Sequence, residues 1–285
     1  MKTKLLIALL LTALTSQASP TITTSNITVA DSIRLFEQDE PDGTGYKLTK
    51  TVTLQWPTEV NGKYSSKLAE FLAEEVFSAS KNRDIIPYIP ADTAILKDFL
   101  SDWVYRDINS NSMTAEFVKK SFLSAPDISA EEYPLSCWYE KTNVRFDHCV
   151  NNLAFFASEY EDYHGGTHGM FFTRYLPFDV RLDKPIHIGD IVTKPSAVIR
   201  MLPKFDNRPE ENKHWQNVTT IDNFYIENGN IIFVFAPYEV GPYCDGEVEV
   251  SVPLSKLQQR GLLTAYGKLF VKGHSINPLK RSSRK

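Results

Sequence analysis

The sequence predicts an α+β fold with a mostly antiparallel sheet and helices packed on one face. Two observations predict it. Strand-like and helical segments fill the N-terminal part, and strand-like runs dominate the C-terminal part. The runs alternate polar and apolar residues, which is typical of strands with one covered face. A chain of 285 residues, 42% of them hydrophobic, is long enough to bury a large core in one domain or two.

Residues 224–254 contain the clearest pattern. Asn228 and Gly229 separate two apolar runs, and this dipeptide favours a two-residue hairpin turn because both positions need positive φ. The unbroken apolar run at residues 231–235 predicts a strand covered on both faces. After a loop, residues 247–252 alternate polar and apolar side chains. The stretch predicts a three-stranded antiparallel meander.

The other elements follow in chain order. Strands are predicted at residues 29–35, 46–56, 137–139, 144–148, 153–163 and 170–180, with Pro57 ending the second. Helices are predicted after the caps Ser65 and Asp92, near residues 114–123, after Pro195, and at residues 254–260. In the second helix, Ile95, Phe99, Leu100 and Trp103 are expected to point inward. Residues 204–218 are expected to form a loop.

The N-terminus predicts export. Two lysines precede an apolar run at residues 5–14, and small residues follow at positions 16 and 18. The run is too short to span a bilayer as a helix, and no later stretch reaches that length. We therefore expect residues 1–18 to be a signal peptide and the protein to be periplasmic or secreted. An uncleaved anchor is the alternative.

We divide the rest into an N-terminal α+β region at residues 19–130, a strand-rich domain at residues 131–275 and a basic tail at residues 276–285. Without residues 1–18 the formal charge falls from −4 to −6. This mildly acidic balance is not typical of chains that bind nucleic acid or an anionic membrane surface.

Cys137, Cys149 and Cys244 make an odd number of cysteines. In an exported chain this indicates one disulfide and one remaining thiol. Cys137 and Cys149 flank adjacent strand-like runs and are the candidate pair. Three reduced cysteines are the alternative, because cysteine often packs as a small apolar residue.

Two loops hold the candidate site. The first contains Tyr163, His164, Gly165, Gly166, Thr167 and His168, and the second contains Tyr238, Glu239 and Tyr243. Glycines predict a tight turn in the first loop, where the histidines either contact a partner or bond nearby backbone groups. The tyrosines of the second loop either anchor a partner or pack beneath the loop. His164 and His168 are four residues apart, a spacing that can bind zinc when both lie on one face of a helix. The glycines between them disfavour a helix, so no metal or other cofactor is predicted.

Both loops resemble those of a known family. The segment from Asp162 to Gly169, with Phe178-Asp179 after it, is similar to a turn in the extracytoplasmic domain of the anti-sigma factor RsiV, a lysozyme receptor. The segment from Ala236 to Tyr243, with Gly246 and Val252-Pro253, resembles the segment before that family's last strand. The upstream region around Trp56-Pro57 looks like the companion domain that also stands ahead of the catalytic domain in peptidoglycan deacetylase C. The resemblance implies the fold and an extracytoplasmic setting.

Two functional hypotheses remain. The first is a non-catalytic envelope protein that binds a protein or a cell-wall glycan, for example a basic, lysozyme-like muramidase suited to an acidic chain. The second is a cell-wall hydrolase that pairs His164 or His168 with a carboxylate such as Asp179 or Glu239. No spacing marks Glu159, Glu161 and Asp162 as an acid and base pair, and we interpret them as a solvated strand face.

Overall fold

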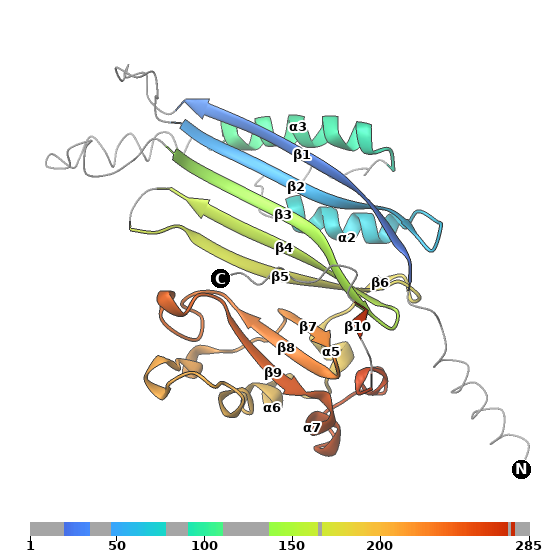
Figure 1. The fold of residues 1–285 in the computed structure, drawn as a ribbon, viewed down its shortest axis with the longest axis vertical. Helices are drawn as coiled ribbons and strands as arrows, with labels where there is room; N and C mark the ends of the chain where they lie inside the picture. Colours follow the sequence, from blue (N-terminus) through green and yellow to red (C-terminus); the bar gives the residue numbers. More distant parts are fainter. Residues whose placement is uncertain are drawn as a thin grey trace, which may run out of the picture.

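The computed structural model describes residues 20–34, 47–77, 91–110, 137–164, 167–272 and 275–276. Their strands form a large seven-stranded sheet and a small three-stranded sheet (Figure 1). Helices cover one face of the large sheet, and the small sheet lies toward the other, so the α+β prediction is confirmed. Among the described helices, none is long and apolar enough to cross a membrane.

The large sheet has the strand order β1-β2-β3-β4-β5-β6, with β10 beside β3. Its strands are β1 (Ile22–Arg34), β2 (Lys47–Val60), β3 (Cys137–Val150), β4 (Leu153–Tyr163), β5 (Met170–Asp179), β6 (Lys184–Pro185) and β10 (Ser275–Ile276). The small sheet contains β7 (Phe224–Glu227), β8 (Asn230–Phe235) and β9 (Val248–Pro253), and the helices are α2 (Ser66–Phe77), α3 (Thr93–Ser110), α5 (Ile188–Ile191), α6 (Pro195–Ile199) and α7 (Leu254–Gln259).

One neighbouring pair in the large sheet, β2 with β3, is parallel, and the other pairs are antiparallel. This pair joins the two regions that the sequence analysis divided near residue 130. Both regions therefore contribute strands to one continuous sheet.

Two strand predictions were wrong. Pro57 does not end β2. It pairs with Thr24 beside a register shift at which β2 has one extra residue, Thr58, and an irregular ladder tolerates proline. The separate runs at residues 137–139 and 144–148 are one strand, β3.

α2 and α3 begin at the predicted caps. Ser65 Oγ accepts a hydrogen bond from the Leu68 amide at 3.2 Å, and Asp92 Oδ1 accepts one from the Ala94 amide at 2.8 Å. The prediction that Ile95 points into the core is wrong. This residue is 57% exposed, and Leu96 is buried instead. The helix predicted near residues 114–123 lies outside the described residues.

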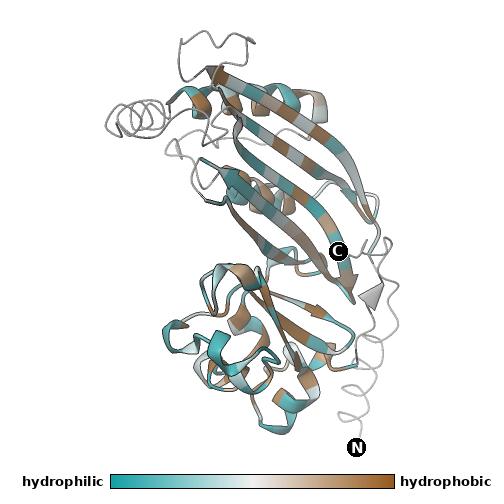
Figure 2. Ribbon diagram, turned by 60° about the vertical axis from the view of Figure 1, so that its left-hand side comes forward, coloured by the Kyte–Doolittle hydropathy of each residue, from teal (hydrophilic) through white to brown (hydrophobic). Residues whose placement is uncertain are grey.

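β4 separates the two hydrophobic cores. Leu153, Phe155 and Ala157 face the small sheet, whereas Ala154 and Phe156 face the helices, as the alternation of a strand requires. Figure 2 shows the large sheet curving past the small one. The small sheet's core covers only this first half of β4, so the second half of the strand forms a more open face.

The small sheet confirms the predicted meander. Asn228 and Gly229 have φ values of 48° and 75° and connect β7 to β8, and β9 pairs with β8 on its other side. Gly261, with φ of 67°, follows α7 as expected.

Side chains from the small-sheet region occupy the edge of β5. Asn223 accepts a hydrogen bond from the Tyr175 amide at 2.8 Å and donates one to the Thr173 carbonyl at 2.7 Å. Glu247 accepts hydrogen bonds from the Thr173 amide and hydroxyl. These groups replace a neighbouring strand and protect the edge from pairing with another chain.

The predicted disulfide between Cys137 and Cys149 is wrong. Both cysteines lie on β3, twelve residues apart, which corresponds to about 40 Å along a strand. Disulfide-bonded residues have Cα atoms within roughly 7 Å. Cys149 is a buried free thiol whose pKa is raised by burial to about 12, and Cys244 is free and exposed.

Candidate functional site

The two predicted loops meet in space. The His168 ring stacks on Tyr243 with a centroid distance of 3.7 Å and an interplanar angle of 16°. His168 Nε2 lies 3.1 Å from the Tyr238 hydroxyl, and the Tyr243 hydroxyl donates to the Gly169 carbonyl at 2.7 Å. We call His168, Tyr238 and Tyr243 the aromatic cluster. Tyr238 is 57% exposed, so the cluster presents an accessible surface.

The turn at Tyr238 has a fixed shape. Tyr238 has φ of 71°, a left-handed conformation that costs a non-glycine residue about 1–3 kcal/mol unless its surroundings hold it. Glu239 Oε2 accepts a hydrogen bond from the Ala236 amide at 3.0 Å and closes the turn. Burial raises the pKa of Glu239. Glu239 was predicted as a partner contact, and the structure gives it this bond within the loop.

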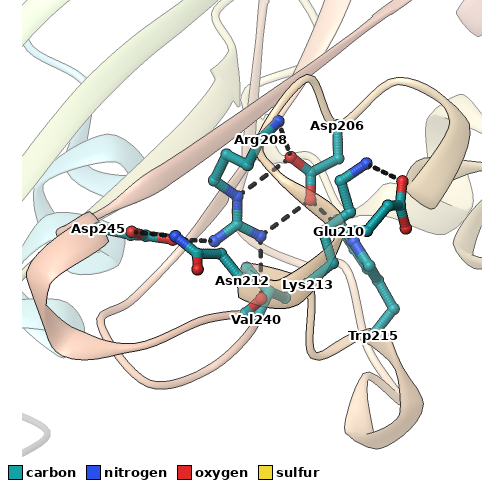
Figure 3. A network of polar contacts seen from close by, with 8 residues as sticks. All are labelled: Asp206, Arg208, Glu210, Asn212, Lys213, Trp215, Val240 and Asp245. Carbon is teal, nitrogen blue, oxygen red and sulfur yellow. Dashed lines mark hydrogen bonds and ion pairs between the residues drawn. The ribbon is translucent and has the colours of Figure 1, made fainter.

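A network centred on Arg208 holds the same loop in place (Figure 3). Arg208 donates to Asp245 and to the Val240 carbonyl, each at 2.9 Å. Asp206 accepts two side-chain hydrogen bonds from Arg208 and one from Trp215 Nε1. Burial opposes ionisation of Asp206, but the bonds from Arg208 outweigh it and hold its pKa below the usual value.

This network was not predicted from the sequence, because residues 204–218 were interpreted only as a loop. The segment contains short 3₁₀ turns, and its combination of a tryptophan with alternating acidic and basic residues was the available signal. Gly241 is also required by the network. A Cβ at Gly241 would lie 2.2 Å from Arg208 Nη1 and 2.9 Å from the Asn212 carbonyl oxygen.

His164 belongs to a different group. Its Nε2 lies 3.1 Å from Glu140 Oε1, and Lys50, which also contacts Asp107, donates to Glu140 Oε2 at 3.1 Å. Burial opposes ionisation of Glu140, but His164 and Lys50 outweigh it and lower its pKa to about 2. The Glu140 carboxylate in turn raises the pKa of His164. Each group of the pair therefore favours the charged form of the other.

The remaining predicted residues are spread between these groups. The Tyr163 ring lies 6.4 Å from that of Tyr139 across the β3–β4 pair, and Thr167 is exposed. Gly165 and Gly166 lie outside the described residues. Among the residues that the structure describes, no three His, Cys, Asp or Glu side chains are grouped to hold a metal ion.

A cleft of about 400 Å³ lies on the open half of β4, beside the aromatic cluster. Its lining residues are Lys141, Asn143, Glu159, Tyr160, Glu161, Phe171, Phe172, Thr173 and Glu247. The Phe171 ring meets the edge of Tyr243 with a centroid distance of 6.0 Å, so cleft and cluster share a wall.

Glu159 and Glu161 hold the polar floor of this cleft in place. Glu159 accepts hydrogen bonds from Asn143 Nδ2 at 2.9 Å and Arg145 Nε at 3.1 Å. Glu161 accepts a 2.6 Å hydrogen bond from Tyr139, which raises the pKa of Tyr139 to about 12. Both glutamates were predicted to lie on a solvated strand face, because the cleft depends on contacts with residues far along the chain.

Residues 197–255 match the family described as "Protein of unknown function (DUF3298)". No curated protein matches the chain. A crystal structure of a DUF3298 family member from Bacteroides fragilis is similar, with a TM-score of 0.64, 19% identity, and coverage of 90% of this chain and 98% of that one. This likeness shows the fold.

A DUF3298 family protein from Pseudomonas aeruginosa has a TM-score of 0.44 and 12% identity, with coverage of 85% and 95% of the two chains. The more specific resemblance to RsiV and to the deacetylase companion stays a prediction. The Arg208 network, Tyr238 and Tyr243 all lie within residues 197–255, the part of the chain that matches the DUF3298 family.

Proposed function

We propose that this chain is an exported, non-catalytic binding module that contacts a protein partner through the aromatic cluster. The stacking of His168 on Tyr243, beside the exposed Tyr238, carries this proposal. Tyrosine is enriched among residues that dominate binding energy, because it offers a large amphipathic surface with few torsions to immobilise.

The cluster is organised before any partner arrives. Arg208 fixes the loop through Asp245 and Val240, and the Tyr243 hydroxyl ties it to the turn at Gly169. A surface held in its binding conformation avoids much of the entropy cost of association. This rigidity supports recognition of a defined partner.

We further propose a basic partner, such as a lysozyme-like muramidase. The chain carries a formal charge of −4, or −6 without the predicted signal peptide. Opposite charge accelerates association and makes it sensitive to salt. The resemblance to RsiV supports the same class of partner, and sequencing the N-terminus of the exported protein tests cleavage after residue 18.

The contacts of the histidines support binding over hydrolysis. His168 contacts Tyr238 and a backbone carbonyl, not a carboxylate. His164 contacts Glu140, but Lys50 binds the other oxygen of that carboxylate at 3.1 Å, so Glu140 is held in an ion-pair network and, with a pKa near 2, is not a general acid at neutral pH. Asp179, one of the two acids considered from the sequence, accepts bonds from Tyr266 and from the backbone amides of Arg181 and Leu182.

Calorimetric titration of residues 19–285 with lysozyme tests the proposal. Tyr238→Ala and His168→Ala should each weaken binding about tenfold or more, equivalent to about 1.4 kcal/mol. Tyr105→Ala is the matched control, because Tyr105 is 58% exposed on α3 and should have no effect. Equal affinities for all variants would contradict the role of the cluster. An absence of heat at roughly 100 μM lysozyme would remove lysozyme as the partner.

A further inference from the structure

We infer that the cleft beside the aromatic cluster is a separate binding site for a neutral, hydroxyl-rich ligand of one or two sugar rings. The inference goes beyond the proposed protein partner and uses other residues. The cleft volume of about 400 Å³ lies within the range of roughly 300–1,000 Å³ that is usual for small-molecule sites.

The floor of the cleft is an ordered array across three strands. In one row, Lys141 on β3 pairs with Glu161 on β4, which pairs with Phe171 on β5. Directly paired residues point to the same face of a sheet. These three side chains therefore stand side by side.

A second row lies next to the first. Asn143 on β3 pairs with Glu159 on β4, which pairs with Thr173 on β5. Glu247, from the small-sheet region, binds the Thr173 amide and hydroxyl and closes that end. The floor rests on regular strands, which position groups more precisely than flexible loops.

The charges of the floor favour a neutral ligand. Glu161 Oε2 lies 3.5 Å from Lys141 Nζ, and Glu159 is paired with Arg145. An ion that bound Glu159, Glu161 or Lys141 would have to separate one of these ion pairs. A hydroxyl group can donate to the carboxylate and accept from the ammonium group at once.

The Lys141–Glu161 pair is also accessible. The two side chains are 52% and 48% exposed, so a ligand can reach both without moving the strands. Three glutamates and one lysine among the lining side chains disfavour phosphate groups, and therefore nucleotides.

Phe171 supplies an apolar wall. Its ring is steadied by the edge contact with Tyr243, and a Cβ at Gly246 would already lie 3.8 Å from it. A sugar ring has polar hydroxyls at its edge and C–H groups on its faces. Such a ring can hydrogen bond to the floor while one face packs on Phe171, which buries apolar area on both.

Titration of the whole protein with three tetrasaccharides, chitotetraose, cellotetraose and maltotetraose, tests the site. Saturable binding of at least one is expected. Glu161→Gln and Phe171→Leu should each weaken that binding about fivefold or more, as expected for loss of one charged hydrogen bond or one aromatic contact. Glu59→Gln, at an exposed position on β2, is the control and should bind like the wild type.

Two features keep the result interpretable. Glu161→Gln preserves shape at a half-exposed position, so it tests the site even if Phe171→Leu lowers the melting temperature. Triarginine and inorganic phosphate serve as cationic and anionic probes. The inference is overturned if no tetrasaccharide binds, if binding ignores both variants, or if either charged probe binds more tightly. Lysozyme binding and Tyr238→Ala report on the protein partner independently.

Discussion

His148 Nε2 lies 2.7 Å from the Ile226 carbonyl oxygen and joins β3 of the large sheet to β7 of the small sheet. His148 is 1% exposed, and its Nδ1 lies 2.7 Å from Asp147 Oδ2. Burial opposes ionisation of Asp147, but His148 and Arg145 outweigh it and hold its pKa well below the usual value. The two ring nitrogens of His148 therefore connect the Asp147 side chain to the backbone of β7.

Replacing His148 with alanine should destabilise the protein by about 3 kcal/mol or more, because it removes a buried ring and its polar contacts with Asp147 and the Ile226 carbonyl. Urea unfolding measures the change. His214→Ala, at an exposed position, should stay within about 0.5 kcal/mol. A loss below about 1 kcal/mol for His148→Ala would show that the contact contributes little.

Glu140 should make stability depend on acid pH. Its pKa is about 2 in the folded protein against an ordinary value of 4.5, so its contribution is present above pH 4.5 and is lost as pH falls toward 2. His164 has a raised pKa, so its contribution is present at low pH and is lost as pH rises through that pKa. The pair stabilises the fold most in the interval between the two titrations.

The measurement is the difference in unfolding free energy between the wild type and Glu140→Gln at several pH values. We expect on the order of 2–3 kcal/mol near pH 5, and a smaller difference at pH 2 and at pH values above the pKa of His164. Glu59→Gln, an exposed substitution, should show a small difference at every pH. A difference that does not change with pH would contradict the ionic pairing of Glu140 with His164.

Gly241→Ala should disturb the loop that carries Tyr238 and Tyr243. The new Cβ would fall 2.2 Å from Arg208 Nη1 and 2.9 Å from a backbone oxygen, and Arg208 is tied to Asp206 and Asp245. Overpacking of this kind costs about 1–3 kcal/mol. Calorimetry should show a lower melting temperature and weaker partner binding.

Gly189→Ala is the matched control for that substitution. A Cβ at Gly189, in α5, would have no heavy atom within 4 Å. The change should be neutral or stabilising by up to about 1 kcal/mol, since alanine restricts the unfolded chain. Similar behaviour of the two variants would show that the Arg208 network tolerates displacement.

Asn223→Ala should loosen the edge of β5, because Asn223 satisfies the Tyr175 amide and the Thr173 carbonyl. We expect a loss of about 1–3 kcal/mol and faster hydrogen exchange of the Tyr175 amide. Asn223→Asp retains the acceptor but not the donor and should be intermediate. Asn217→Ala, an exposed substitution, should change neither quantity, and unchanged exchange in Asn223→Ala would refute the edge-capping role.

Local chemistry made several elements predictable from the sequence. Asn228-Gly229 adopts positive φ at both positions, and Asp92 caps α3 through its own carboxylate, so neighbouring residues suffice to determine each feature. Ile95 was misplaced because the buried stripe of α3 runs through Leu96 and Leu100, and the register of an amphipathic helix against a sheet depends on the partner.

Features set by distant residues were not predictable. The pairing of β2 with β3 joins segments whose own sequences do not specify a neighbour. For the candidate site, the motifs identified His168, Tyr238 and Tyr243, which the structure brings together. The cleft was missed, since it exists because the small sheet covers one half of β4 and leaves the other half open.

The parallel pairing of β2 with β3 constrains the order in which the chain can assemble. The β1–β2 hairpin is made early in synthesis, yet its neighbour β3 is complete only when residue 150 has been added. Pairing across such a long sequence separation is intrinsically slow and leaves intermediates prone to aggregation. A nascent chain halted before β3 would therefore leave one edge of β2 without its neighbouring strand. The complete sheet could form only after more than half of the polypeptide had been synthesised.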